Sequence, residues 1–342
     1  ETPDFDIILS DINMPEMDGL TLLAKINELK NPAMKCIMVS AYGDMENIRS
    51  AMNKGAFDFA TKPIDLEDLS HTIEKAIEQV RYIRESQQEH SQLESIRNDL
   101  AIAGEIQQTI LPRLFPPFPE LAEYVDIYAS MTPARDVGGD FYDFFRIDDE
   151  NIGLVIADVS GKGVPAALFM AVSRTLLRAT ALRGVPSSEC LTYANKLLCK
   201  ESLDSMFVTV FYGIYNYKTG IMDYTNAGHN PPYILRQNHH IETLPLTPNF
   251  IVGVFDDISF ENGMLKLETG DTLLMYTDGV TEAFNEEREQ FSENRLQNAL
   301  KTLPENPQTK DVVTEILRQV KNFSGNYPQS DDITLLSLQR TE

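Results

Sequence analysis

The sequence predicts two structural classes joined by a helix. An α/β segment with a partial doubly wound parallel sheet comes first, then a long helical linker with coiled-coil character, then an α+β domain built as a β-sandwich flanked by helices. Three observations support this. Short apolar strands alternate with helical patterns up to about residue 65, a helical pattern runs on to Gly104 without proline or glycine, and strand patterns dominate after a cluster of prolines. The predicted boundaries are 1–65, 66–111 and 112–342.

The first segment is predicted from alternating elements. Strand patterns cover residues 5–10, 35–40 and 57–61, and helical patterns at about 20–29 and 45–54 separate them. In sheets of this kind, functional groups collect at the carboxyl ends of the strands.

The linker pattern favours a coiled coil. Apolar residues recur at the 3-4 spacing of a coiled-coil seam from Leu66 to Ile83, and the seam weakens at Gln87 and His90. It resumes from Leu93 one residue out of phase, which would change the supercoil locally. A dimerising linker is the favoured interpretation, and a single amphipathic helix packed on its own domains is the alternative.

Prolines at 112, 116, 117 and 119 end the helix and mark the last boundary. Strand and helix patterns then mix, as expected for a layered sandwich with flanking helices. The predicted strands are 151–157, 207–215 with a hairpin turn at 218–220, 271–276 and 333–338, and the predicted helices are 165–182, 189–200 and 311–322.

Composition excludes several classes of protein. The formal net charge of −23 argues against nucleic-acid binding, which needs clustered Lys and Arg. No apolar run approaches the length of a membrane span, and no signal-peptide pattern is present. The three cysteines form neither a disulfide framework nor a metal-binding spacing, which indicates a reducing, cytoplasmic location.

Four aspartates form the strongest chemical pattern. Asp140, Asp158, Asp278 and Asp331 are each expected where an apolar strand gives way to a turn, so they can converge on one site. Like charges gathered in this way need a cation. Because hard divalent cations prefer oxygen ligands, the sequence predicts a magnesium or manganese centre that activates water.

Asp11 follows the first predicted strand, Ser40 closes the second and Lys62-Pro63 closes the third. In this order and spacing the segment resembles the response-regulator receiver family of two-component signalling. The resemblance implies that Asp11 is the phosphoacceptor, that Ser40 and Lys62 contact its phosphoryl oxygens, and that a histidine kinase supplies the phosphate to an intact receiver. A receiver has two further strands and its acidic magnesium pair before this point. The sequence is therefore expected to be either a fragment of a longer chain, which we favour because the remaining motif positions are intact, or a degenerate receiver.

The second half carries an ordered series of motifs that is similar to the SpoIIE-type branch of the metal-dependent protein serine/threonine phosphatases. The similarity spans about residues 100 to 340. Its motifs are Ile106-Gln107 to Leu111-Pro112, Pro133 to Asp143, Asp158-Val-Ser-Gly-Lys-Gly163, Asn226 to Pro232, Tyr276 to Ala283 and Asp331-Asp-Ile-Thr334.

The resemblance implies a role for each acid. Asp158 would bridge two Mg²⁺ or Mn²⁺ ions, with the Val159 carbonyl as a further ligand. Asp140 would serve the same cluster directly or through water, and Asp278 and Asp331 would hold the other ion. Two cations can activate a shared water and neutralise phosphoryl oxygens, which suits hydrolysis of a phosphate ester.

Other polar residues have alternative interpretations. Arg135 is the best candidate for holding the substrate phosphate, with a surface loop arginine as the alternative. Asp332 and Asp143 rank below the four acids as supporting acids, caps or extra ligands. We expect a structural role for His229. Type 2C relatives have a histidine just after the bridging aspartate, where this chain has Ser160.

The sequence therefore predicts a two-component-regulated phosphatase that removes phosphate from Ser or Thr of a partner protein. The resemblance points to an anti-sigma-factor antagonist as substrate. The linker pattern favours a homodimer, and the charge and the apolar runs argue against a nucleic-acid or membrane partner. The alternative is a catalytically silent adaptor that binds a partner through the same fold. Retention of all four acids favours the enzyme.

Overall fold

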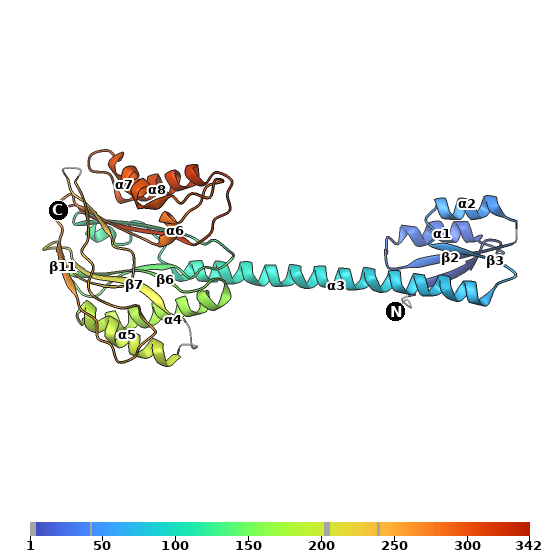
Figure 1. Ribbon diagram of the computed structural model, residues 1–342, viewed down its shortest axis with the longest axis horizontal. Coiled ribbons are helices and arrows are strands. Elements are labelled where there is room, and N and C mark those ends of the chain that lie inside the picture. Colours follow the sequence, from blue (N-terminus) through green and yellow to red (C-terminus); the bar gives the residue numbers. More distant parts are fainter. Residues whose placement is uncertain (1–4, 42, 202–205, 238–239) are drawn as a thin grey trace. The chain divides into compact units, whose positions relative to one another are not determined.

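The computed structural model describes residues 5–41, 43–201, 206–237 and 240–342 (Figure 1). It divides into two compact units, Glu1–Asn98 and Asp99–Glu342, and helix α3 (Leu66–Ile110) contributes to both. The predicted fold class is confirmed: the first unit has a parallel sheet, α3 is a single long helix, and the second unit is a sandwich of antiparallel sheets. No helix in the described part of the chain is long and apolar enough to cross a bilayer.

The first unit is a three-stranded parallel sheet in the order β1-β2-β3, with helices α1 and α2 connecting the strands. The bounds are β1 (Ile7–Asp11), α1 (Gly19–Glu28), β2 (Lys35–Ala41), α2 (Met45–Asn53) and β3 (Asp58–Lys62). The predicted elements lie within two residues of these bounds.

The start of α1 fixes the carboxyl end of β1. Asp18 caps the helix by accepting a 2.6 Å hydrogen bond from the Thr21 amide. Gly19 lies against the Asp11 carbonyl, and a methyl group at Gly19 would be only 2.3 Å from that oxygen. Leu23 and Ile26 on the buried face of α1 then pack into the core of this unit.

The second unit contains two five-stranded sheets in which every pairing is antiparallel. The first sheet has the order β10 (Ile241–Thr243), β9 (Tyr233–Leu235), β12 (Thr272–Tyr276), β13 (Ile333–Arg340) and β4 (Val125–Thr132). The second has the order β11 (Gly263–Lys266), β8 (Ile221–Ala227), β7 (Val208–Asn216), β6 (Asn151–Val159) and β5 (Phe141–Arg146).

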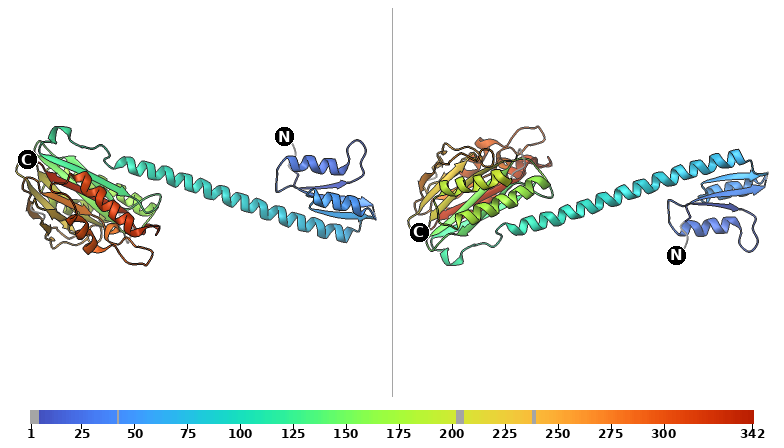
Figure 2. Two further views of the ribbon diagram at one scale, coloured as in Figure 1. Left: turned by 90° about the horizontal axis from the view of Figure 1, so that it is seen from above. Right: turned by 90° about the horizontal axis from the view of Figure 1, so that it is seen from below.

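Helices cover the outer face of each sheet (Figures 1 and 2). Helices α7 (Ser292–Lys301) and α8 (Thr309–Ser324) lie on the first sheet, and α4 (Val164–Ala181) and α5 (Ser187–Glu201) lie on the second. The other helical segments of this unit are short: α6 (Asp278–Thr281) and a 3₁₀ turn at Pro119–Leu121.

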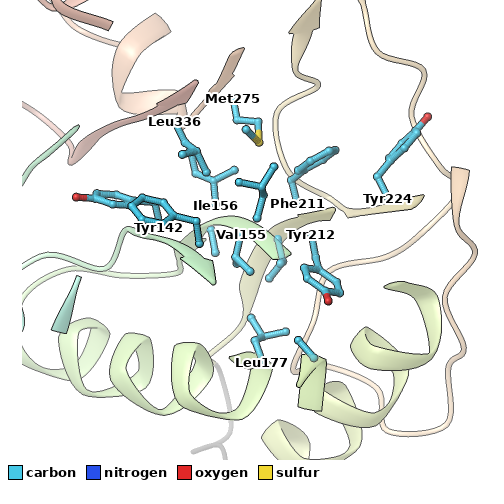
Figure 3. Packing of buried hydrophobic residues seen from close by; sticks show 14 of the residues in the cluster. Tyr142, Val155, Ile156, Leu177, Phe211, Tyr212, Tyr224, Met275 and Leu336 are labelled. Atoms are coloured by element: carbon cyan, nitrogen blue, oxygen red, sulfur yellow. The ribbon is translucent and has the colours of Figure 1, made fainter. Parts of the chain in front are cut away.

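The main core fills the space between the sheets and continues under α4. Met275 and Leu336 of the first sheet face Ile156 and Phe211 of the second (Figure 3). Leu177 of α4 packs on the opposite side of the second sheet. Strands β6 and β7 are therefore covered on both faces, which explains why β6 reads as a continuous apolar run.

Two features of the second unit differ from the prediction. The four aspartates were expected at strand ends, but Asp140 and Asp331 lie just before β5 and β13 begin. Only Asp158, near the end of β6, and Asp278, two residues after the end of β12, match that expectation. Antiparallel neighbours run in opposite directions, so the start of one strand and the end of the next meet at the same edge.

The second difference is that β4, β5, β9, β10, β11, α6 and α7 were not predicted. The alternating burial of β4 was a readable signal, whereas β5 is buried on both faces and shows no alternation. Helix α7 buries only three of its residues, Leu296, Ala299 and Leu300.

Candidate active site

The four predicted acids come together at one edge of the second unit. Asp140 is 2% exposed, and its Oδ2 accepts a 2.7 Å hydrogen bond from the Thr334 hydroxyl. Asp158 shares a side-chain hydrogen bond with Asp140 and lies close enough to Asp278 and Asp331 for both to affect its pKa. Four separate elements thus deliver acids to one place.

Burial and mutual repulsion make this cluster electrostatically unfavourable. Burial raises the pKa of Asp140 well above its usual range, and the charges of Asp158 and Asp332 raise it further. Burial and the neighbouring Asp278 raise the pKa of Asp158 to about 7. The pKa of Asp278 is also raised, first by burial and then by Asp331. The cluster therefore lacks sufficient positive charge nearby.

Asp332 has a different role from its neighbour Asp331. Its Oδ1 accepts a 2.8 Å hydrogen bond from the Ala134 amide, and its Oδ2 accepts from the amides of Gly139 at 2.6 Å and Asp140 at 3.3 Å. The carboxylate is thus held by the loop before β5 and fixes the backbone that carries Asp140.

Gln107 at the end of α3 holds the same loop from another side. Its Nε2 donates to the Gly138 carbonyl at 2.6 Å, and its Oε1 accepts from the Gly138 amide at 2.9 Å. The side chain is 6% exposed. Gly104, one turn earlier, lies so close to the loop that a methyl group there would be 2.2 Å from the Asp136 carbonyl. Gln107 lies in the predicted Ile106-Gln107 motif, but its sequence context did not indicate this role.

Replacing Gln107 by leucine should lower both activity and stability. Leucine preserves the buried volume but leaves the Gly138 amide and carbonyl without partners, at a cost of about 1–3 kcal/mol. We expect the metal-dependent rate of phosphate release to fall about 10-fold or more, because Asp140 loses its fixed position. Steady-state kinetics with thermal unfolding as the control will check this, and wild-type kinetics in Gln107→Leu would contradict it.

Two cationic side chains border the acids. Lys162 follows β6, and its Nζ lies 2.8 Å from Asp331 Oδ2. Arg135 is exposed in the loop before β5, and a methyl group at Gly163 would be 4.0 Å from its Nη1. The Val159 carbonyl faces the loop that carries Asp140: a methyl at Gly139 would be 2.9 Å from that oxygen. The structure thus places Arg135 near Gly163 and the Val159 carbonyl near Gly139, and their roles toward phosphate and cation stay predictions.

Three other residues have structural partners. Asp143, 1% exposed, binds Arg174 and Arg178 of α4 at 3.0 and 3.1 Å, so it joins β5 to α4. His229 is 3% exposed, and burial lowers its pKa to about 4, so near neutral pH it has no proton to donate as an acid. The Ser160 hydroxyl accepts a 2.9 Å hydrogen bond from the Phe207 amide.

The donor set suits a divalent cation, although the side chains are not arranged as a finished coordination sphere. Within the described ranges, no group of three or more His, Cys, Asp or Glu side chains forms a metal site as it stands. Asp140 is hydrogen-bonded to Thr334 and Asp331 is paired with Lys162, and these contacts partly explain why the acids do not converge on one point. Buried carboxylates with raised pKa values are nonetheless the oxygen donors that Mg²⁺ and Mn²⁺ prefer.

In the first unit, two of the three predicted receiver residues meet. The Lys62 ammonium contacts the Asp11 carboxylate, and this hydrogen bond is the main cause that lowers the pKa of Asp11. Ser40 is fully buried on the neighbouring strand, where its hydroxyl donates to Asp44 at 3.2 Å.

Comparison with known proteins places these features in families. The family model "Stage II sporulation protein E (SpoIIE)" matches residues 148–341, and the model "Response regulator receiver domain" matches residues 1–74. The chain is 33% identical to Protein IcfG of Synechocystis sp. over 273 residues, which cover 71% of this chain and 42% of that protein. It is 32% identical to Phosphoserine phosphatase RsbU of Bacillus subtilis over 224 residues, covering 64% of this chain and 65% of RsbU.

The chain thus spans less than two thirds of either relative. Among solved structures, the SiaA-PP2C domain of Pseudomonas aeruginosa shares the fold with a TM-score of 0.62 and 20% identity, covering 73% of this chain and 98% of that one. The chain belongs to the SpoIIE family, with a receiver-domain segment preceding the family's domain.

Proposed function

We propose that this chain is a metal-dependent phosphatase that hydrolyses phosphoserine or phosphothreonine on a partner protein. The observation that carries the proposal is the buried acid cluster, in which burial and mutual repulsion raise the pKa values of Asp140, Asp158 and Asp278. A folded protein retains such a cluster at a cost in stability, and a bound cation removes that cost.

The residues divide into two groups around the cations. Asp158, Asp140 and the Val159 carbonyl would hold one ion, and Asp278 and Asp331, with Asp158 as the bridge, would hold the other. Two Mg²⁺ or Mn²⁺ ions bound there would lower the pKa of a water and neutralise phosphoryl oxygens.

The chain's other residues orient the reactants. Asp332 and Gln107 keep the backbone of Asp140 in place through five hydrogen bonds to the preceding loop. Arg135, exposed at the rim, would bind the substrate phosphate as a charge-assisted donor.

A phosphorylated protein is the proposed substrate because RsbU, named a phosphoserine phosphatase, is 32% identical to this chain. The resemblance favours an anti-sigma-factor antagonist. A phosphoproteomic comparison of cells carrying the wild-type chain or Asp158→Asn tests this: the substrate's phosphosite should accumulate in the variant. Equal phosphorylation of every antagonist protein would contradict the assignment.

The competing proposal is an adaptor that binds a partner without catalysis. Release of phosphate from p-nitrophenyl phosphate that requires Mn²⁺ or Mg²⁺ and stops with a chelator distinguishes the two. A folded chain with no metal-stimulated release would favour the adaptor.

We propose that an intact receiver accepts phosphate on Asp11 from a histidine kinase, and that the domain division 1–65, 66–111 and 112–342 separates receiver, linker and phosphatase. The linker is the proposed dimer contact. Apolar side chains remain exposed along α3, as expected if a second copy covers them: Ile77, Leu93, Ile96, Ile102 and Ile106.

Sedimentation at micromolar concentration should therefore show a dimer. Replacing Leu93 and Ile96 by serine should shift it to a monomer, because both apolar seam positions become polar. A wild-type chain that sediments as a monomer, or a double variant that remains a dimer, would contradict the prediction.

A further inference from the structure

Lys162 occupies an unusual position for a lysine in a proposed cation site. Its Nζ lies 2.8 Å from Asp331 Oδ2 and donates a 2.6 Å hydrogen bond to the Ser330 carbonyl. Its charge also reaches Asp278, where it partly offsets the rise in pKa caused by burial and by Asp331. The ammonium therefore serves both acids that are proposed to hold the second cation.

The segment that carries Lys162 has room to move. Gly161 and Gly163 on either side have positive φ angles of 89° and 76°. Among the residues that the structure describes, a methyl group at Gly161 would meet nothing within 4 Å, and one at Gly163 would meet only Arg135 Nη1 at 4.0 Å. The Lys162 side chain is itself 43% exposed. The half-exposed ammonium contacts Asp331 and the Ser330 carbonyl, so leaving Asp331 breaks these contacts and moves the charge toward water.

A divalent cation and this ammonium cannot share Asp331 without cost. An ion bound by Asp278 and Asp331 would lie within a few ångströms of Nζ, and like charges at that range repel strongly when partly shielded from water. Lys162 must therefore swing away when the cation arrives. Exposed and half-exposed ion pairs contribute little stability, so this exchange is readily reversible.

We propose that Lys162 is a displaceable counter-cation, which neutralises Asp331 before the second divalent cation binds and thereby sets the affinity of the Asp278–Asp331 position. This rests on the proposed function, because it takes those two acids as cation ligands. It gives Lys162 a role in metal loading that is separate from hydrolysis itself.

The test is a Mn²⁺ titration of the full chain followed by the electron paramagnetic resonance signal of free Mn²⁺. Lys162→Met keeps the length of the side chain and removes its charge. We expect the weaker Mn²⁺ binding step to tighten about two- to five-fold, the strength of a partly exposed ion pair. Raising the ionic strength should shrink the difference between the two proteins, because salt screens the ammonium.

Two control variants separate the effect of a positive charge at position 162 from the effect of the net charge of the chain. Lys162→Arg keeps a cation there and should bind Mn²⁺ within two-fold of wild type. Lys218→Met removes the same charge from an exposed lysine paired with Glu150, and should also leave Mn²⁺ binding unchanged. Equal tightening in Lys218→Met would show a net-charge effect and overturn the proposal.

Unchanged or weaker Mn²⁺ binding in Lys162→Met would also overturn it, while metal-dependent hydrolysis by the wild-type chain would leave the proposed function standing. Conversely, a wild-type chain that binds Mn²⁺ but hydrolyses nothing contradicts the proposed function alone, and the comparison of affinities still decides the role of Lys162. A chain that binds no Mn²⁺ contradicts both.

Discussion

Replacing Asp158 by asparagine is expected to lower metal-dependent hydrolysis of p-nitrophenyl phosphate by about 10³-fold or more. Stabilisation of transition-state charge by bound cations is worth several kcal/mol, and each 1.36 kcal/mol corresponds to a factor of ten in rate. Asp158 is proposed to bridge both cations, so its loss affects both. Initial rates at saturating Mn²⁺ measure the effect.

The same change should stabilise the chain in the presence of a chelator. Burial and the charge of Asp278 raise the pKa of Asp158 to about 7, so its ionised form is unfavourable in the folded state. Asparagine removes that charge and keeps the shape, and the unfolding temperature should rise by a few degrees. A variant that is both less stable and inactive would show damage to the fold instead of loss of a cation ligand.

Replacing Asp143 by alanine is expected to destabilise the second unit by about 3–5 kcal/mol, because it leaves the partners of a buried ion pair without their counter-charge. Arg174 is only 12% exposed, and its Nε already lacks a hydrogen-bond partner among the described residues. Arg178 also packs over the Phe145 ring at 5.0 Å. Burial raises the pKa of Asp143, and the two arginines oppose that rise.

Urea unfolding followed by near-ultraviolet circular dichroism of the tyrosines measures this effect. Asp149→Ala is the matched control: Asp149 pairs with Arg146 at 3.4 Å, but its side chain is fully exposed, so we expect a change below about 0.5 kcal/mol. Equal effects of the two substitutions would contradict a structural role for the Asp143 cluster.

The four acids could be predicted from the sequence because they occur in short motifs at element boundaries, where turn residues and charges are easily recognised. In the structure the four acids lie close to one another, since, in addition to burial, Asp158 raises the pKa of Asp140, and Asp331 raises the pKa of Asp158 and Asp278; their role as cation ligands stays a prediction. The prediction that Asp140 and Asp331 lie where strands end was wrong, because each lies before a strand begins. For Asp140 the reason is that the following strand, β5, lacks alternation and so was not recognised as the strand that begins after this acid.

The supporting contacts could not be predicted, since their partners are distant in the chain. Gln107 binds a residue 31 positions away, and Lys162 binds one 168 positions away. A glutamine on a helix is ordinarily exposed and uninformative, and only the tertiary contact with Gly138 shows its role. Asp332 was ranked below Asp331 for the same reason. The two adjacent aspartates differ in the direction in which their side chains point, and that direction depends on how the loop packs.

The most direct test of the central claim is phosphate release from a phosphoserine peptide by the full chain, measured while Mn²⁺ is titrated from a chelated starting state. We predict no release with chelator, a rise that saturates as Mn²⁺ binds, and loss of that rise in Asp158→Asn. Release that is independent of metal, or that survives unchanged in Asp158→Asn, would contradict a metal-dependent phosphatase centre built on the acid cluster.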